Sequence, residues 1–83
     1  MREVYYTNRF RKDFKLAIKR GLDMTLIQTV MKDLENEIVL EQKYQEHPLS
    51  GQYIGCRECH IQPDWLLIYQ LDGNCITFVR TGS

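Results

Sequence analysis

The sequence lacks any long apolar segment. No run approaches the roughly 18 consecutive apolar residues that suggest a membrane-spanning helix. The first residues include charged ones and form no apolar core of a secretion signal. Cysteine is scarce, with three residues, and an odd number does not fit a closed disulfide framework. We therefore expect a cytoplasmic protein with reduced thiols and no membrane partner.

The remaining composition fits one small globular domain. The 83 residues are 43% hydrophobic and 27% charged, with two prolines, no internal repeat and no low-complexity segment. A chain this short builds one core at most, so nearly every large apolar side chain must serve it. We expect a single domain across residues 1–83.

The chain has no net charge, yet its charges are unevenly distributed. Residues 1–20 contain seven lysines and arginines against two acids, a balance of +5, whereas residues 21–83 carry −5. A basic N-terminal fifth is typical of a surface that binds an anionic partner such as nucleic acid. A solvated helix face explains the same pattern, so the charges alone leave both interpretations open.

Two stretches show the periodicity of amphipathic helices. The first follows Thr7, a good N-cap residue, and Gly21 fits its C-terminal end; Asp23 fits the N-cap of the second. The short connection predicts an antiparallel helix hairpin whose apolar stripes share one surface. The stripe residues are Phe10, Phe14, Ala17 and Ile18 in the first helix and Ile27, Val30, Met31 and Leu34 in the second.

Strand patterns flank the helices. One short strand is predicted at residues 3–6, and three more at about 52–61, 65–71 and 75–80, after an irregular stretch at 36–51. Turn sequences at residues 62–64 and 72–74 make the last three strands antiparallel. The predicted fold is α+β with the order β-α-α-β-β-β: an antiparallel sheet with the two-helix hairpin on one face and the other face partly free.

The motif CRECH at residues 56–60 matches the C-x-x-C-H pattern of haem attachment. Haem attachment requires export, and the motif lies in a predicted strand where its two cysteines point to opposite faces. A zinc site built from the three cysteines and a histidine is an alternative, but only half of a zinc knuckle is present. The favoured interpretation is that the thiols act as small apolar side chains, and we expect no metal site and no cofactor.

Period-two geometry assigns the strand side chains to faces. Glu58 and His60 lie opposite Ile61, whose side chain suits the helix-covered core, so they are expected on the free face. On the last strand, Arg80 shares a side with Phe78 and lies near the strand end, where it can reach the same open surface.

Such a surface suits metal-free cleavage of RNA. The reaction needs a base for the 2′-OH, a cation for the phosphorane and an acid for the 5′-oxygen. Histidine can transfer protons near neutral pH, and arginine grips phosphate through paired hydrogen bonds. The candidates are His47 on a loop, His60, Asp64 and Arg80. Each also has a structural explanation, such as an Arg80–Glu58 ion pair, and periodicity does not decide between them.

Ordered motifs along the whole chain resemble the YafQ branch of the RelE-like toxin superfamily. They are FRKDFKLA at residues 10–17, HPLSG at 47–51, RECH at 57–60, PDWLLIY at 63–69 and RTGS at 80–83. The resemblance implies a type II toxin–antitoxin toxin with the RelE-like microbial RNase fold. Its activity would be that of an mRNA interferase, a metal-independent endoribonuclease that cuts messages in the ribosomal A site.

The resemblance also implies roles for individual residues. Arg80 would stabilise the phosphate, His60 and Asp64 would transfer protons or place the substrate, and His47 completes the catalytic set. The basic residues of the first helix would face ribosomal RNA. The residues expected to contact RNA are Arg9, Arg11, Lys12, Lys15, Lys19, Glu58 and Trp65.

The partners implied by the resemblance are a cognate DinJ- or RelB-like antitoxin, in a heterotetramer, and the ribosome with its mRNA. Family members usually continue past R-x-G-[ST] with a histidine thought to be the general acid, whereas this chain stops at Ser83. A truncated tail is therefore expected to weaken catalysis, since general acids typically contribute about 10²- to 10⁴-fold. The alternative is a non-catalytic module of the same fold that binds antitoxin or RNA without cutting.

Overall fold

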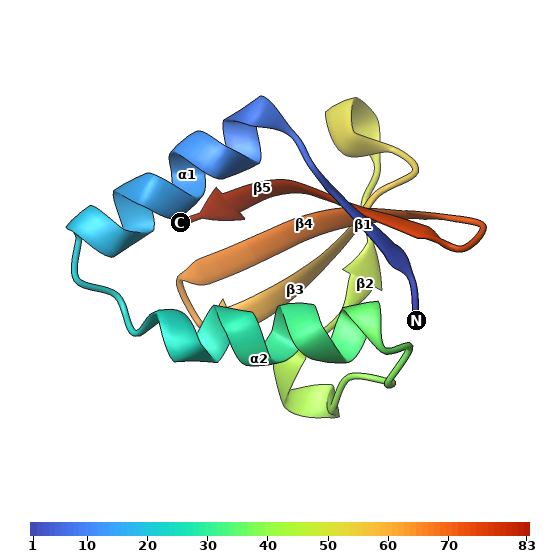
Figure 1. Ribbon diagram of the computed structural model, residues 1–83, viewed down its shortest axis with the longest axis horizontal. Helices are drawn as coiled ribbons and strands as arrows, with labels where there is room; N and C mark the ends of the chain where they lie inside the picture. Colours follow the sequence, from blue (N-terminus) through green and yellow to red (C-terminus); the bar gives the residue numbers. More distant parts are fainter.

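The computed structural model describes residues 1–83 as two helices and a five-stranded mixed sheet. The chain begins with strand β1 and the two helices, and the other strands follow (Figure 1). The elements are β1 (Glu3–Tyr6), α1 (Asn8–Lys19), α2 (Met24–Glu35), the 3₁₀ turn η1 (Gln42–Tyr44), β2 (His47–Pro48), the 3₁₀ turn η2 (Gly51–Tyr53), β3 (Arg57–Gln62), β4 (Trp65–Asp72) and β5 (Cys75–Gly82).

The sheet order is β1-β5-β4-β3-β2. The last strands form antiparallel hairpins as predicted, and β1 adds to β5 in parallel, with Val4 opposite Ile76. The predicted α+β class is confirmed, with a sheet that is mixed because of β1. A short edge strand, β2, was not foreseen; it places His47 opposite Glu58.

The helix ends follow from local sequence. The Thr7 hydroxyl accepts a hydrogen bond from the Phe10 N–H, and the Asp23 carboxylate accepts one from the Thr25 N–H. Gly21 follows α1 with a φ of +75°, in the left-handed region that glycine adopts without strain. The predicted helix boundaries are therefore confirmed. Neither helix is long and apolar enough to cross a membrane.

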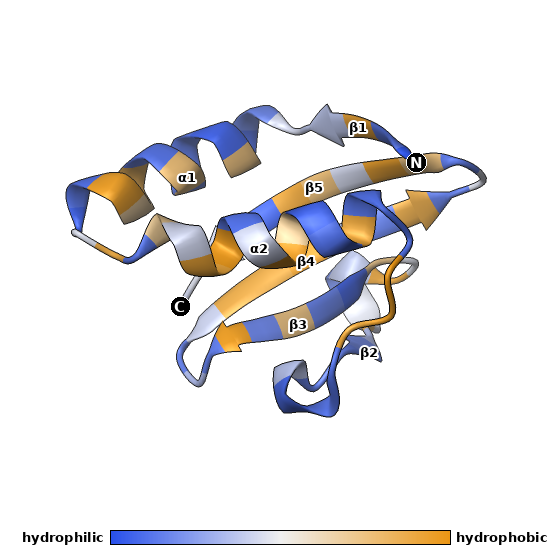
Figure 2. Ribbon diagram, turned by 60° about the horizontal axis from the view of Figure 1, so that its bottom comes forward, coloured by the Kyte–Doolittle hydropathy of each residue, from blue (hydrophilic) through white to orange (hydrophobic).

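Both helices turn apolar stripes towards one face of the sheet, where a single core forms (Figure 2). One stripe position was predicted wrongly: Ile18 is 54% exposed, whereas Phe10 and Ala17 on the same helix are buried. The fully buried core side chains include Phe10, Ile27, Val30, Cys59, Leu67, Tyr69, Ile76 and Phe78.

The predicted strand at residues 52–61 begins too early. Residues 51–53 form the turn η2, and pairing with β4 starts at Arg57. Gly51 and Gly55 both have positive φ, so the chain turns twice before the strand begins. The later two strands extend one or two residues beyond their predicted ends.

A β-bulge in β5 changes the side on which Arg80 lies. Tyr69 pairs with Phe78 and the preceding Ile68 pairs with Arg80, so Val79 is an extra residue in β5. The prediction that Arg80 shares a side with Phe78 is therefore wrong. Arg80 lies opposite half-exposed Ile68, on the face away from the helices.

The core contains one polar group without a partner, the hydroxyl of Tyr69. Removing an unsatisfied buried hydroxyl relieves its desolvation penalty, so Tyr69→Phe should raise the free energy of unfolding by about 1 kcal/mol. Urea unfolding followed by circular dichroism measures this, with Tyr6→Phe on the exposed β1 as a control expected near zero. A clear loss of stability in Tyr69→Phe would show that the hydroxyl has a partner after all.

Candidate functional site

Four residues form one row across the open face of the sheet. His47 on β2 is opposite Glu58 on β3, which is opposite Ile68 on β4, which is opposite Arg80 on β5. Neighbouring strands lie about 4.8 Å apart, so the Cα atoms of Glu58 and Arg80 are roughly 10 Å apart. His60 lies two positions along β3 from Glu58, on the same face. Long side chains from both ends of this row can reach a ligand lying between them.

His47 is oriented by two oxygen acceptors. Its Nδ1 lies 2.8 Å from the Gln45 carbonyl oxygen, and its Nε2 lies 3.2 Å from Glu58 Oε1. A neutral imidazole carries one N–H, whereas the imidazolium can donate to both oxygens at once. The His47 and His60 ring centres are 6.2 Å apart, and His60 forms no hydrogen bond or ion pair of its own. The structure thus places one fixed and one free imidazole side by side.

Arg80 is held by residues from two distant segments. Its Nε is 2.7 Å and its Nη2 3.3 Å from the Asp13 carboxylate on α1, while its Nη1 is 3.4 Å from the hydroxyl of Tyr53, the last residue of η2. The hydrogen bond to Asp13, followed by that to Tyr53, raises the pKa of Arg80 above its already high ordinary value. The guanidinium is therefore a permanent cation with a fixed plane.

Asp13 also joins α1 to the end of the sheet. Its Oδ2 accepts a hydrogen bond of 3.1 Å from the Thr81 N–H, on the part of β5 that extends beyond its pairing with β1. With Asp13 and Tyr53 engaged, one N–H at Nη1 and one at Nη2 of Arg80 remain without a partner. These N–H groups can donate to the oxygens of a phosphate or a carboxylate.

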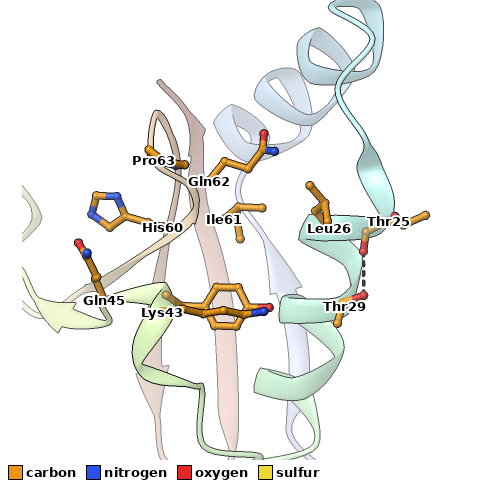
Figure 3. Close-up of a pocket in the computed structure, with 10 residues that line it drawn as sticks. Thr25, Leu26, Thr29, Lys43, Gln45, His60, Ile61, Gln62 and Pro63 are labelled. Atoms are coloured by element: carbon orange, nitrogen blue, oxygen red, sulfur yellow. Dashed lines mark hydrogen bonds between the residues drawn. The ribbon is translucent and has the colours of Figure 1, made fainter.

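Shallow hollows lie beside these groups. One of about 170 Å³ is bounded by Tyr53, Leu66, Ile68, Arg80 and the last three residues. A second, of about 440 Å³, lies between α2, η1 and the end of β3, with His60 at its border (Figure 3). Figure 3 shows the His60 ring on one side of β3 and Ile61 on the other, towards α2. The smaller hollow gives room for a ligand beside Arg80 on the open face, whereas the larger one, which His60 borders, lies towards α2 at the sheet edge.

Two sequence-predicted residues lie elsewhere. Asp64 is exposed in the turn between β3 and β4 and forms no side-chain hydrogen bond or ion pair. Trp65 is only 2% exposed, and its Nε1 donates a 3.0 Å hydrogen bond to Thr81 Oγ1. This burial does not support a contact of the indole with RNA, because core residues cover the ring.

The basic side chains of α1 have different neighbours. Arg9 borders a hollow that also contains Arg80. Arg11 lies over the Tyr6 ring, 5.4 Å from its centre, and with Lys15 borders a different hollow between α1 and α2. Lys12 and Lys19 are exposed, and no ion pair engages them. Arg9 alone among them borders a hollow together with Arg80, and the expectation that these residues face RNA stays a prediction.

The cysteines take no part in this site. All three are free, and Cys56 and Cys59 are buried. Burial raises the pKa of the Cys59 thiol to about 12, so it stays protonated near neutral pH. The chain has no group of three or more potential metal ligands of the histidine, cysteine or carboxylate kind. Apolar packing accounts for the buried thiols, as the sequence suggested.

Sequence reasoning missed Asp13 and Tyr53, which fix Arg80. One signal was available for Asp13, because it is the only acid in a helix with several lysines and arginines. Its position four residues after Arg9 places both on one side of α1. No comparable signal existed for Tyr53, since a loop brings it to Arg80.

Comparison with known proteins gives consistent matches. The family described as "Bacterial toxin of type II toxin-antitoxin system, YafQ" matches residues 2–83. The mRNA interferase toxin YafQ of Escherichia coli K12 is 41% identical over 99% of this chain and 90% of the relative.

Two solved structures extend the comparison. The E. coli DinJ–YafQ complex is similar with a TM-score of 0.92 and 40% identity, over 100% of this chain and 93% of that one. A metal-bound toxin from Helicobacter pylori is similar with a TM-score of 0.92 and 40% identity, over 100% and 94%.

Proposed function

The chain belongs to the YafQ family of bacterial toxins of type II toxin–antitoxin systems, and from this premise we propose that it is an mRNA interferase. It would cut mRNA in the ribosome and need no metal ion. One observation carries the proposal: Arg80, fixed on β5, and two imidazoles, on β2 and β3, lie on the same open face of the sheet.

The proposed reaction uses the RNA's own 2′-OH as nucleophile. A base takes the 2′-OH proton, the oxygen attacks phosphorus, and the bond to the 5′-oxygen breaks as an acid returns a proton to it. The products are a 2′,3′-cyclic phosphate and a free 5′-OH. Arg80 would stabilise the phosphorane, and His60 would transfer protons directly, supported by His47. Glu58 holds His47, and Asp64, exposed at the edge, would help to place the substrate.

We further propose that a DinJ-type antitoxin silences this chain. Support comes from the E. coli relative, whose structure is a complex with DinJ. The proposed assembly is a heterotetramer in the cytoplasm, where the toxin meets translating ribosomes. Co-expression with a DinJ-type antitoxin, followed by light scattering, tests both the partner and the stoichiometry.

A reconstituted translation reaction tests the enzyme. With a defined mRNA on ribosomes, the chain should give cuts in the A site, and chelator should leave the rate unchanged. Cutting that chelator abolishes and added Zn²⁺ restores would contradict the metal-free mechanism, which matters because the H. pylori relative is metal-bound. Binding to the ribosome without any cutting would favour the non-catalytic module.

Replacing Asp13 tests how much the orientation of Arg80 contributes while Arg80 itself is kept. Asp13→Ala removes the two acceptors that set the guanidinium plane, so kcat should fall by about 10- to 30-fold while KM changes little, since misplaced transition-state contacts mainly affect the chemical step. Asp13→Glu should recover part of the loss because it restores a carboxylate. If the variants merely lost structure, both would have a lower melting temperature, and the selective fall in kcat with an unchanged KM would not be seen.

A further inference from the structure

We propose that the hollow bordered by Arg9, Gln52 and Arg80 binds the phosphate next to the one that is cleaved. This inference deepens the proposed function, on which it rests, by assigning a second phosphate subsite. The hollow has a volume of about 190 Å³ and is also lined by Thr7, Tyr53 and Val79.

The two hollows around Arg80 are neighbours. The first opens on the sheet face beside Leu66 and Ile68, and the second opens towards the start of α1. Tyr53 and Arg80 border both. Consecutive phosphates of one RNA strand need adjacent cationic sites, and a groove that passes over one shared arginine supplies them.

The charges of the second hollow favour an anion. Its lining contains two guanidinium groups and no acid, whereas Asp13 contacts Arg80 from outside the lining. Arg9 and Gln52 are exposed and engage in no hydrogen bond or ion pair, so their donors are available. A single phosphate can accept from both side chains.

The position of Arg9 distinguishes it from the other basic residues of α1. Arg9 and Asp13 are four residues apart and lie on one side of the helix, which faces the end of β5. Arg20, at the other end of α1, lies about 17 Å along the helix axis from Arg9. Arg20 therefore carries the same charge outside the groove and provides a matched control.

Binding of a short RNA tests the subsite. The probe is a labelled trinucleotide with 2′-O-methyl groups, which cannot be cut, and two phosphodiesters. In companion probes each linkage in turn is a neutral methylphosphonate. Arg9→Gln should weaken binding of the all-phosphate probe about 10-fold, the size of one hydrogen bond to a charged group. In one of the two companion probes the neutral linkage occupies the proposed subsite. Arg9→Gln and the unaltered chain should bind that probe with equal affinity, because Arg9 has no charge there to contact.

The salt dependence of RNA binding shows whether a side chain contributes through its charge or as a neutral hydrogen-bond donor. Arg9→Gln should lower the slope of log affinity against log salt by about 0.7, the contribution of one phosphate contact on a single strand. Gln52→Ala should weaken binding about threefold with an unchanged slope, because a neutral donor releases no counterion. Arg20→Gln should change neither quantity.

Three outcomes would overturn the subsite. They are an equal loss in Arg9→Gln on every probe, the same loss in Arg20→Gln, and no measurable binding of the trinucleotide by the unaltered chain. Failure of the nuclease proposal looks different, since it would leave mRNA uncut by the unaltered chain whatever the trinucleotide does. If mRNA is cut and Arg9→Gln has no effect, the nuclease stands and only the second subsite fails.

Discussion

Arg80→Gln lowers the rate of ribosome-dependent mRNA cleavage by about 10³-fold, the size expected when a preorganised donor to a developing negative charge is removed. The structure gives the reason. Arg80 is the one guanidinium fixed on the open face, with its plane set by Asp13 and Tyr53. Single-turnover cleavage of mRNA on ribosomes measures the effect on the chemical step.

Arg80→Lys is expected to recover little of this rate. A lysine ammonium cannot span both Asp13 oxygens and still present a fork of donors, so activity should stay about 10²-fold low. Arg57→Gln is the matched control, because Arg57 pairs with Glu46 at 3.5 Å and lies on the opposite face of β3 from Glu58 and His60. It should leave cleavage within about twofold, as expected for a partly exposed pair.

The free energy of unfolding of each Arg80 variant must be measured together with its cleavage rate. Arg80→Gln leaves Asp13, a residue with a side chain only 15% exposed, without its cation. The ion pair itself is partly exposed and contributes about 1 kcal/mol or less. The double variant Asp13→Asn, Arg80→Gln removes the unpaired charge and should still fail to cut. A variant at Arg80 that folds and cuts at the normal rate would contradict the proposed role of the arginine.

Much of the fold was predictable because its information is local. The helix caps Thr7 and Asp23, the turn at Gly21 and the hairpin at residues 72–74 each depend on a few neighbouring residues. The parallel pairing of β1 with β5 was not predictable in this way. It joins residues more than 70 positions apart, and the periodicity of a single strand does not indicate such a contact.

The site was predictable in its residue types but not in its geometry. Strict alternation placed Arg80 with Phe78, whereas the bulge at Val79 turns it to the open face. A bulge is a property of the paired strands, so a single strand pattern does not reveal it. The partnership of Arg80 with Asp13 is likewise tertiary, and the sequence offered Glu58 as the more obvious partner. Glu58 pairs with His47 instead.

The two histidines are expected to differ in importance. Both rings lie on the same side of the sheet, but His47 has each nitrogen facing an oxygen, whereas His60 has neither nitrogen engaged. A group that transfers protons needs a nitrogen free to meet the substrate. His60 is therefore the better candidate for direct proton transfer, and the pair of His47 with Glu58 would support it by fixing charge nearby.

Replacement of His60 by glutamine should consequently lower the single-turnover cleavage rate by about 10³-fold, and that of His47 by about 10-fold, since loss of a general acid or base typically costs 10²- to 10⁴-fold. Glutamine keeps a polar side chain of similar length, so affinity for an uncut RNA should change little in either variant.

Glu58→Gln should resemble His47→Gln, and the double variant should be no worse than either single one, because the two residues act as a unit at 3.2 Å. The reverse ranking, with His47 essential and His60 dispensable, would assign the proton transfer to His47 and require Nε2 to leave Glu58 when RNA binds.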